Sequence, residues 1–311
     1  MNRDSLSSLL AALFAGPAAE PSRDLSTFWR EHRARSDKHP LAFDRAAFGG
    51  LHAATVGQAF VAGYRAALQR LVPSLGREPA ALCVTEAQGA HPRAIQSTIT
   101  ADGGAFVLRG SKRWASVGES PLVLLVVARE GEHDDGRPSL RVARVPADRA
   151  GVIVQSMSEY PVVPDVAHAS IALDNVRVSR DELLDGDGYS GVVKPFRTIE
   201  DIHVFGAVLA YLVAVGRASR WPAAVLASLV APIVALRSLA EEDPSAPSTH
   251  LALGATLDHA KAAVNALDAR WDTVETARRD GWYRDSVLLQ VASKARAERM
   301  SAAARALSLD E

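Results

Sequence analysis

The spacing of apolar residues divides the chain into three zones. In the first zone, residues 1–78, apolar residues recur every three to four positions, and the clearest stretch runs from Phe43 to Leu71. This spacing predicts one long amphipathic helix, which Pro73 would end. The same spacing returns in long alanine-rich stretches over residues 191–311, where it is broken by the polar segment at residues 241–248. We therefore predict a helical domain at each end of the chain.

The middle zone, residues 79–190, has the pattern of strands. Residues 95–100 and 105–109 alternate around an Ala-Asp-Gly-Gly turn, which predicts a hairpin. The uninterrupted apolar run at residues 122–128 predicts a central strand. Further strands are expected at residues 140–145, 151–155 and 169–178. Strands that are segregated from helices along the chain are typical of an α+β fold. We therefore predict a middle β-barrel or sandwich between an N-terminal helical part and a C-terminal helical bundle.

Composition and charge argue against several classes of function. Lys and Arg total 35 and Asp and Glu total 36, so the formal net charge is −1 and no basic surface for nucleic acid or an anionic membrane is expected. The most apolar later run, Val204–Gly216, is shorter than the roughly 18 residues that a membrane span needs. The single cysteine, Cys83, cannot form an internal disulfide. We expect a cytoplasmic protein without nucleic-acid or membrane partners.

One strand end carries more polar chemistry than a fold requires. The buried-looking strand Leu82-Cys83-Val84 leads directly into Thr85 and Glu86, and then into an irregular turn that contains glycine and proline. A hydroxyl, a carboxylate and exposed backbone groups at the end of an apolar strand indicate a ligand site. The alternative is an ordinary strand end with a solvated carboxylate.

Two segments, in this order along the chain, resemble a known family. The segments LCVTEAQGAHP (residues 82–92) and LRGSKRWASVG (residues 108–118) resemble the middle domain of the acyl-CoA dehydrogenases, flavoproteins with a strand ending in Thr-Glu-Pro and a later L-x-G-x-K-x-W-I-T motif. A thinner resemblance extends over residues 45–300. It implies the fold described above, FAD as the cofactor, and an acyl-CoA-type or other small-molecule substrate.

The resemblance also implies how the cofactor is held. Thr85 would bond the pyrimidine side of the flavin, Trp114 would pack beside the ring, and Ser116 would stand where the family's threonine bonds the reactive nitrogen. Taken alone, Trp114 could equally be a core aromatic and Cys83 an inert apolar residue. The implied cofactor-binding residues are Leu82, Cys83, Val84, Thr85, Glu86, Gly89, Ala90, His91, Trp114, Ala115 and Ser116.

The sequence departs from the family pattern in the turn after the strand. Ala87 stands where the family has proline, and Ala90-His91-Pro92 stands where it has Gly-Ser-Asp. Because the family's serine meets the thioester side of the substrate, His91 becomes the candidate substrate-binding residue. The alternative is that His91 is a surface turn residue.

The catalytic base is the larger departure. The chain has no Gly-Gly-x-Gly-Tyr motif, which precedes the catalytic glutamate in most of the family. A minority of the family place the acid on the first C-terminal helix, and the corresponding position here is Ile202. Glu200, Asp201 and His91 are therefore only weak candidates. Glu200 and His203 form an i,i+3 pair, which could be an acid–base couple or a surface pair, and we favour the surface pair.

The hypothesis from the sequence is a FAD-dependent oxidoreductase that acts on the CH–CH group of an acyl thioester or a related small substrate. A flavin-dependent monooxygenase of the same fold is the first alternative, and a non-catalytic paralogue that binds a ligand or partner is the second. The apolar C-terminal helices would suit a homo-oligomer, a dimer or tetramer, and an electron-transfer partner is left open. No metal site is expected, because His250, Asp258 and His259 lack the spacing of a helical metal pair.

Overall fold

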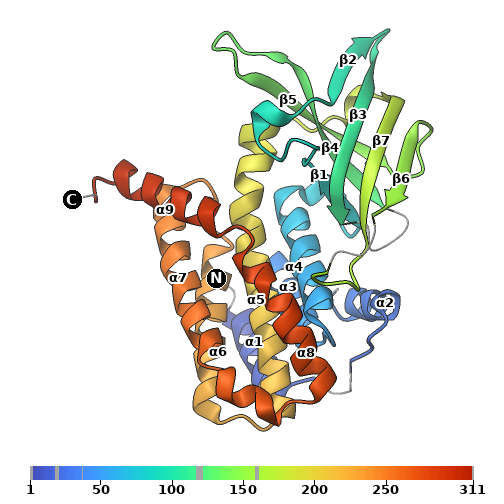
Figure 1. Cartoon of the computed structure of the whole chain (residues 1–311). Helices are drawn as coiled ribbons and strands as arrows, with labels where there is room; N and C mark the ends of the chain where they lie inside the picture. Colours follow the sequence, from blue (N-terminus) through green and yellow to red (C-terminus); the bar gives the residue numbers. More distant parts are fainter. Residues whose placement is uncertain (1–2, 18–20, 37, 117–121, 158–160, 310–311) are drawn as a thin grey trace. The chain divides into compact units, whose positions relative to one another are not determined.

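The computed structural model of the chain describes residues 3–17, 21–36, 38–116, 122–157 and 161–309 (Figure 1). Helices come first, strands follow and helices return, so the predicted α+β fold is confirmed. The chain forms two compact units. The helical unit comprises Met1–Arg70, Pro161–Asp165 and Thr198–Glu311, and the sheet unit comprises Leu71–Tyr160 and Val166–Arg197. The N-terminal and C-terminal helices thus belong to one unit.

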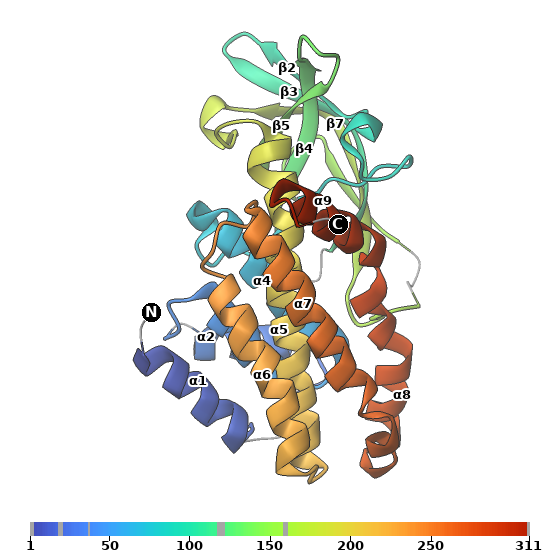
Figure 2. The ribbon, with the colours of Figure 1, turned by 90° about the vertical axis from the view of Figure 1, so that its left-hand side faces the viewer.

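The helical unit holds helices of very different length. The elements before the sheet are α1 (Arg3–Ala15), α2 (Leu25–Ser36), α3 (Ala42–Leu51) and α4 (Val56–Leu71). Those after it are α5 (Lys194–Ala218), α6 (Ala223–Leu239), α7 (Pro247–Asn265), the 3₁₀ turn η5 (Asp268–Thr273), α8 (Thr276–Asp285), the 3₁₀ turn η6 (Ser286–Gln290) and α9 (Ser293–Ala306). Helix α7 packs along both α6 and α9 (Figure 2).

The single helix predicted from Phe43 to Leu71 is wrong, because the structure has α3 and α4 there. The break is set by side-chain caps. Thr55 Oγ1 accepts a hydrogen bond from Gln58 N at 3.1 Å, and Gln58 Oε1 accepts one from Ala54 N at 2.7 Å. These two bonds satisfy donors at the start of α4, as a reciprocal N-terminal cap does.

Two glycines let α3 and α4 lie against α5. A Cβ at Gly50 would stand 1.9 Å from Ala207 O, and a Cβ at Gly63 would stand 2.6 Å from Val204 Cα. No side chain fits at either crossing, so the helix backbones approach closely there.

A buried ion pair joins α3 to α6. Arg237 donates to both oxygens of Asp44 at 2.7 and 3.1 Å, and both side chains are almost fully buried. The two-bond geometry matches the planar guanidinium to the carboxylate.

The sheet unit is built on one seven-stranded sheet among its described residues. The strand order is β1-β4-β2-β3-β7-β6, and β5 pairs with β4. The strands are β1 (Ala80–Cys83), β2 (Thr98–Asp102), β3 (Ala105–Ser116), β4 (Val123–Glu132), β5 (Pro138–Pro146), β6 (Val152–Ser156) and β7 (His168–Val178). The predicted hairpin is β2–β3, and the predicted central strand is β4, which pairs with β1, β2 and β5.

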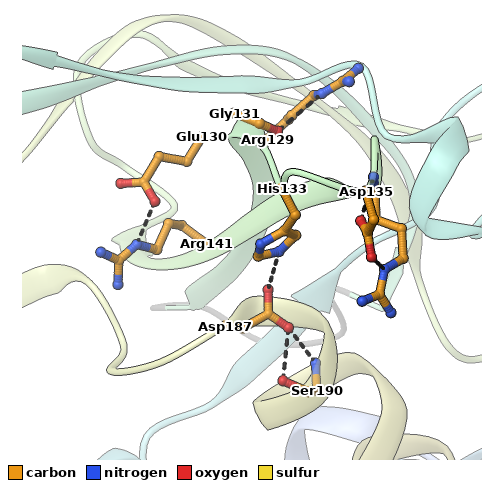
Figure 3. A network of polar contacts seen from close by, with 9 residues as sticks. Arg129, Glu130, Gly131, His133, Asp135, Arg141, Asp187 and Ser190 are labelled. Atoms are coloured by element: carbon orange, nitrogen blue, oxygen red, sulfur yellow. Dashed lines mark hydrogen bonds and ion pairs between the residues drawn. The ribbon is translucent and has the colours of Figure 1, made fainter.

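The segment that follows β7 is tied to the β4–β5 hairpin (Figure 3). Leu184 N donates to Val142 O at 2.9 Å. Asp187 Oδ1 accepts from both N and Oγ of Ser190 at 2.8 Å, in the first residues of the short π-helix η4 (Tyr189–Val193) that leads into α5. His133, at the hairpin tip, brings Nε2 to 4.0 Å from the other oxygen of Asp187. These contacts fix the end of the sheet unit where α5 begins.

The run Val204–Gly216 belongs to a longer helical stretch than the sequence pattern indicated. Residues Tyr189–Ala218 form a continuous 30-residue helical stretch that is long and apolar enough to cross a membrane by length and composition alone. Its most apolar window is 94% buried within the protein, which is the burial expected of a core helix.

Candidate functional site

The strand end singled out from the sequence is a short buried strand followed by a tight turn. All four residues of β1 are buried, and Thr85 after it is half-buried. Glu86 and Gly89 exchange two backbone hydrogen bonds of 3.0 Å each, which closes the turn. Gly89 has φ +110°, a conformation that favours glycine. The turn therefore projects from the end of the strand with a defined backbone.

The carboxylate of Glu86 points into the sheet unit. It accepts hydrogen bonds from Lys112 Nζ at 2.6 Å, Gln96 N at 2.7 Å and Ser97 N at 3.1 Å. Lys112 is 0% exposed and the Glu86 side chain 6%. Burial alone would raise the pKa of Glu86, but the hydrogen bond and charge of Lys112 and the added donors lower it below its ordinary value. The alternative of a solvated carboxylate at this strand end is wrong.

Strand β3 is kinked beside this turn. Its ladder with β7 shifts register between Lys112 and Ala115, and Trp114 has φ +61°. A non-glycine residue in this region costs on the order of 1–3 kcal/mol, and such strain concentrates at functional sites. Arg113 N donates to Thr85 O at 2.8 Å, so the kink is bonded to the residue that follows β1. The two segments that carry the family resemblance therefore lie side by side.

The kink exposes the Trp114 indole. The residue is 42% exposed, and its ring centroid lies 6.3 Å from that of His168 in an edge-on arrangement. Bulges in strands re-aim side chains in this way. Burial lowers the pKa of His168, and its Nδ1 lies 2.9 Å from Val166 O. The interpretation of Trp114 as a core aromatic is therefore wrong.

The other residues of the implied cofactor set differ in accessibility. Ala115 and Ser116 are buried, and Ser116 pairs with His168 across the β3–β7 ladder. The rest of that motif, Val117-Gly118, lies outside the described residues. Cys83 is buried, which raises the pKa of its thiol to about 12 and fits its interpretation as an inert residue.

His91 has a local structural role. It is exposed, and its Nδ1 accepts a hydrogen bond from Arg93 N at 3.2 Å, which caps the 3₁₀ turn η2 (Pro92–Ala94). The structure thus gives this histidine a turn-capping contact, as the surface-turn interpretation expected.

The acidic candidates of α5 have different environments in the helical unit. Asp201 accepts from Arg296 at 2.9 Å and also from Arg299, so its carboxylate is held by two guanidinium groups. Glu200 is half-buried and lines a cavity of about 100 Å³. Asp201 and its partner Arg296 line the same cavity, and the rest of the lining is apolar: Phe60, Val204, Phe205, Leu288, Leu289, Val291 and Ala292. We call this space the Glu200 cavity.

The surface pair expected for Glu200 and His203 is wrong. His203 is 0% exposed, its Nδ1 lies 2.7 Å from Ile199 O, and its buried Nε2 has no hydrogen-bond partner in the described parts of the chain. Burial is the main reason that the pKa of His203 falls to about 4. At neutral pH the residue is an uncharged core histidine.

This burial predicts a pH dependence of stability. The pKa of a histidine is about 6.5 in the unfolded chain. As pH falls from 6.5 to 4, His203 takes up a proton in the unfolded chain. In the folded protein its pKa is about 4, so it stays mostly uncharged over this range. The free energy of unfolding should therefore fall by about 3 kcal/mol over this range on account of this residue.

Chemical denaturation at several pH values tests this dependence. His203→Met should flatten the decline between pH 6.5 and 4, whereas His259→Gln, at an exposed histidine of α7, should leave it unchanged. Equal slopes for the His203 variant and the wild type would contradict the assignment.

Lys112 was not among the site residues expected from the sequence. The signal was present, because Leu108 and Lys112 are four positions apart in β3 and period-two alternation puts both on the same face. Leu108 is fully buried, so a lysine on its face requires an acidic partner.

Comparisons with known proteins place these residues in a family context. Residues 81–176 match the family model described as acyl-CoA dehydrogenase, middle domain. Probable acyl-CoA dehydrogenase FadE10 of Mycobacterium tuberculosis (strain ATCC 25618 / H37Rv) is 31% identical over 104 residues, which are 32% of this chain and 16% of that relative. The chain therefore matches only a small part of the relative's length.

Solved structures resemble the chain along most of its length. The prolyl acyl carrier protein oxidase AnaB has a TM-score of 0.72 and 14% identity, with coverage of 97% of this chain and 98% of that one. A structure described as a FAD-dependent dehydrogenase has a TM-score of 0.68 and 15% identity, with coverage of 100% and 99%. At these identities the similarity shows a shared fold.

Proposed function

We propose that this chain, an acyl-CoA dehydrogenase-like protein by its middle-domain match and its fold, is a FAD-dependent oxidoreductase that oxidises the CH–CH bond of an acyl thioester or a related small substrate. One observation carries the proposal. The strand end at Thr85 and the kinked strand at Trp114 are hydrogen-bonded neighbours, and both fall inside the matched residues.

The residues at this place fit a flavin. A flavin ring has two flat faces and a polar edge, and its buried polar groups each need a partner, at a cost of about 1–3 kcal/mol when one is missing. The exposed Trp114 indole offers a flat contact, and half-buried Thr85 offers a hydroxyl at the strand end. The Glu86–Lys112 ion pair holds the turn next to Thr85 and Trp114 in place, and both of its side chains are buried. Thr85, Trp114 and Ser116 would hold the cofactor.

A bound flavin supplies a two-electron acceptor, and this chain's residues must handle the proton. Glu200 is the candidate base kept here, because it lines a small, mostly apolar cavity of the helical unit and burial of this kind suits a general base. Asp201 is held by two arginines and His91 caps a turn, so both are weaker candidates. Glu200 would accept the substrate proton as general base.

Anaerobic titration with acyl thioesters tests the activity. We expect a thioester of suitable length to bleach the visible absorbance of the FAD-loaded protein, because the substrate's electrons reduce the flavin. If no thioester bleaches it, and a reductant such as NADH followed by air produces an oxygenated product, the activity is monooxygenation and the proposal is wrong in its reaction type.

We also propose a homo-oligomer, a dimer or tetramer. The support is a set of exposed apolar side chains near the last helical segments: Val287, Val291 and Leu307. Size-exclusion chromatography with light scattering measures the subunit number, and a monomeric mass at micromolar concentration would contradict this part of the proposal.

A further inference from the structure

We propose that a cavity among the C-terminal helices binds a small amphipathic carboxylate, a molecule with one ring-sized apolar body and one anionic group. The cavity has a volume of about 340 Å³. Small-molecule sites in proteins are commonly about 300–1,000 Å³ and combine apolar walls with a few polar groups. We call it the aromatic cavity, and its lining includes Phe205, Trp282, Tyr283, Leu289, Lys261 and Asp268.

The apolar wall is held rigidly by an aromatic cluster. Trp282 is 4% exposed and stacks on Trp271, with ring centroids 5.2 Å apart and an interplanar angle of 14°. Trp271 is itself 1% exposed and meets Trp221 edge-on at 5.8 Å. An indole fixed in this way offers a preformed contact, so a ligand ring does not have to order it first.

The next residue, Tyr283, stands at the cavity with its side chain largely in water. It is 55% exposed, which is high for a large aromatic residue. A ligand ring in the cavity would remove part of the Tyr283 ring from water, and that burial is favourable.

The polar side of the cavity contains one cation and one anion. Lys261, on α7, lies 3.2 Å from Asp258 in an ion pair whose side chains are 38% and 66% exposed. Exposed pairs of this kind are weak, so the ammonium can accept a ligand carboxylate as a further partner. Asp268 would repel a second negative charge, and this favours a monocarboxylate over a dianion.

The aromatic cavity is a different place from the Glu200 cavity. The two share Phe205 and Leu289, which stand in the lining of both. Glu200 lines only the smaller one, and the residues proposed to hold the flavin line neither. Binding in the aromatic cavity can therefore be measured without reference to catalysis.

Calorimetric titration of the purified full chain tests the proposal with indole-3-propionate and its uncharged amide as probes. We expect the acid to bind saturably and the amide to bind about tenfold more weakly, because the amide cannot form the charge-assisted contact with Lys261. Lys261→Met should reduce the affinity for the acid to that for the amide. Lys294→Met is the matched control, since it removes the same charge from a side chain that is 92% exposed on α9, and it should change neither affinity.

A second variant tests the position of the site. Ser286→Trp places a large side chain at a half-exposed position of the lining and should abolish binding of both probes, with circular dichroism to confirm that the fold is intact. Two results would overturn the proposal. One is the lack of saturable binding of the acid by the wild type up to about 1 mM. The other is equal affinity for the acid in the wild type and in Lys261→Met.

Discussion

Replacing Lys112 with methionine is expected to lower the free energy of unfolding by about 3–5 kcal/mol. The reason is that Lys112 Nζ lies 2.6 Å from Glu86 Oε1 and both side chains are almost fully buried. The variant would leave a buried carboxylate whose remaining donors, from Gln96 and Ser97, carry no charge. Urea denaturation followed by circular dichroism measures the change.

Two further variants separate the ion pair from a general effect of charge. Arg113→Met removes the same charge from the adjacent, exposed position and should change stability by no more than about 0.5 kcal/mol. The double variant Glu86→Gln with Lys112→Met should recover much of the loss, because it buries no unpaired charge. A Lys112→Met protein as stable as Arg113→Met would show that the pair does not brace the turn.

Replacing Glu200 with glutamine is expected to slow substrate-driven flavin reduction by about 10²–10⁴-fold, the usual contribution of a positioned general base. Glutamine keeps the size of the side chain but cannot accept a proton, so FAD retention and the fold should be unchanged. Stopped-flow absorbance under anaerobic conditions measures the rate.

The matched control for this change is Glu242→Gln, which alters an exposed glutamate between α6 and α7 and should leave the rate unchanged. Full activity of the Glu200 variant would remove it as the base. Asp201 and His91 would then be the remaining candidates from the sequence.

Apolar periodicity was sufficient to predict the order of elements and the main strands. The hairpin, the central strand β4 and the α+β class follow from alternation and from the lengths of apolar runs. The break between α3 and α4 did not follow, because apolar residues keep helical spacing through it. The side chains of Thr55 and Gln58 decide that break by capping, and their hydrogen bonds become visible only in three dimensions.

The site could be located from sequence, but its internal arrangement could not. The motif at residues 82–92 identified the strand end. A solvated carboxylate at Glu86 remained an alternative, because its partner Lys112 lies 26 positions later in the sequence. The positive φ of Trp114 has no signal in the sequence, since a tryptophan rarely adopts it. His203 was favoured as a surface residue because the i,i+3 rule describes spacing along a helix and not which face is buried.

The absorption spectrum of the purified protein, recorded before and after FAD is added and the excess removed, is the direct test for a flavin at the strand end. We expect retained flavin bands, which Thr85→Ala and Trp114→Ala weaken. Thr256→Ala and Phe14→Ala, at a half-buried threonine and an exposed phenylalanine of the helical unit, serve as matched controls and should leave the bands unchanged. Absence of retained flavin under both conditions would contradict the proposal that the strand end and the kinked strand form a cofactor site.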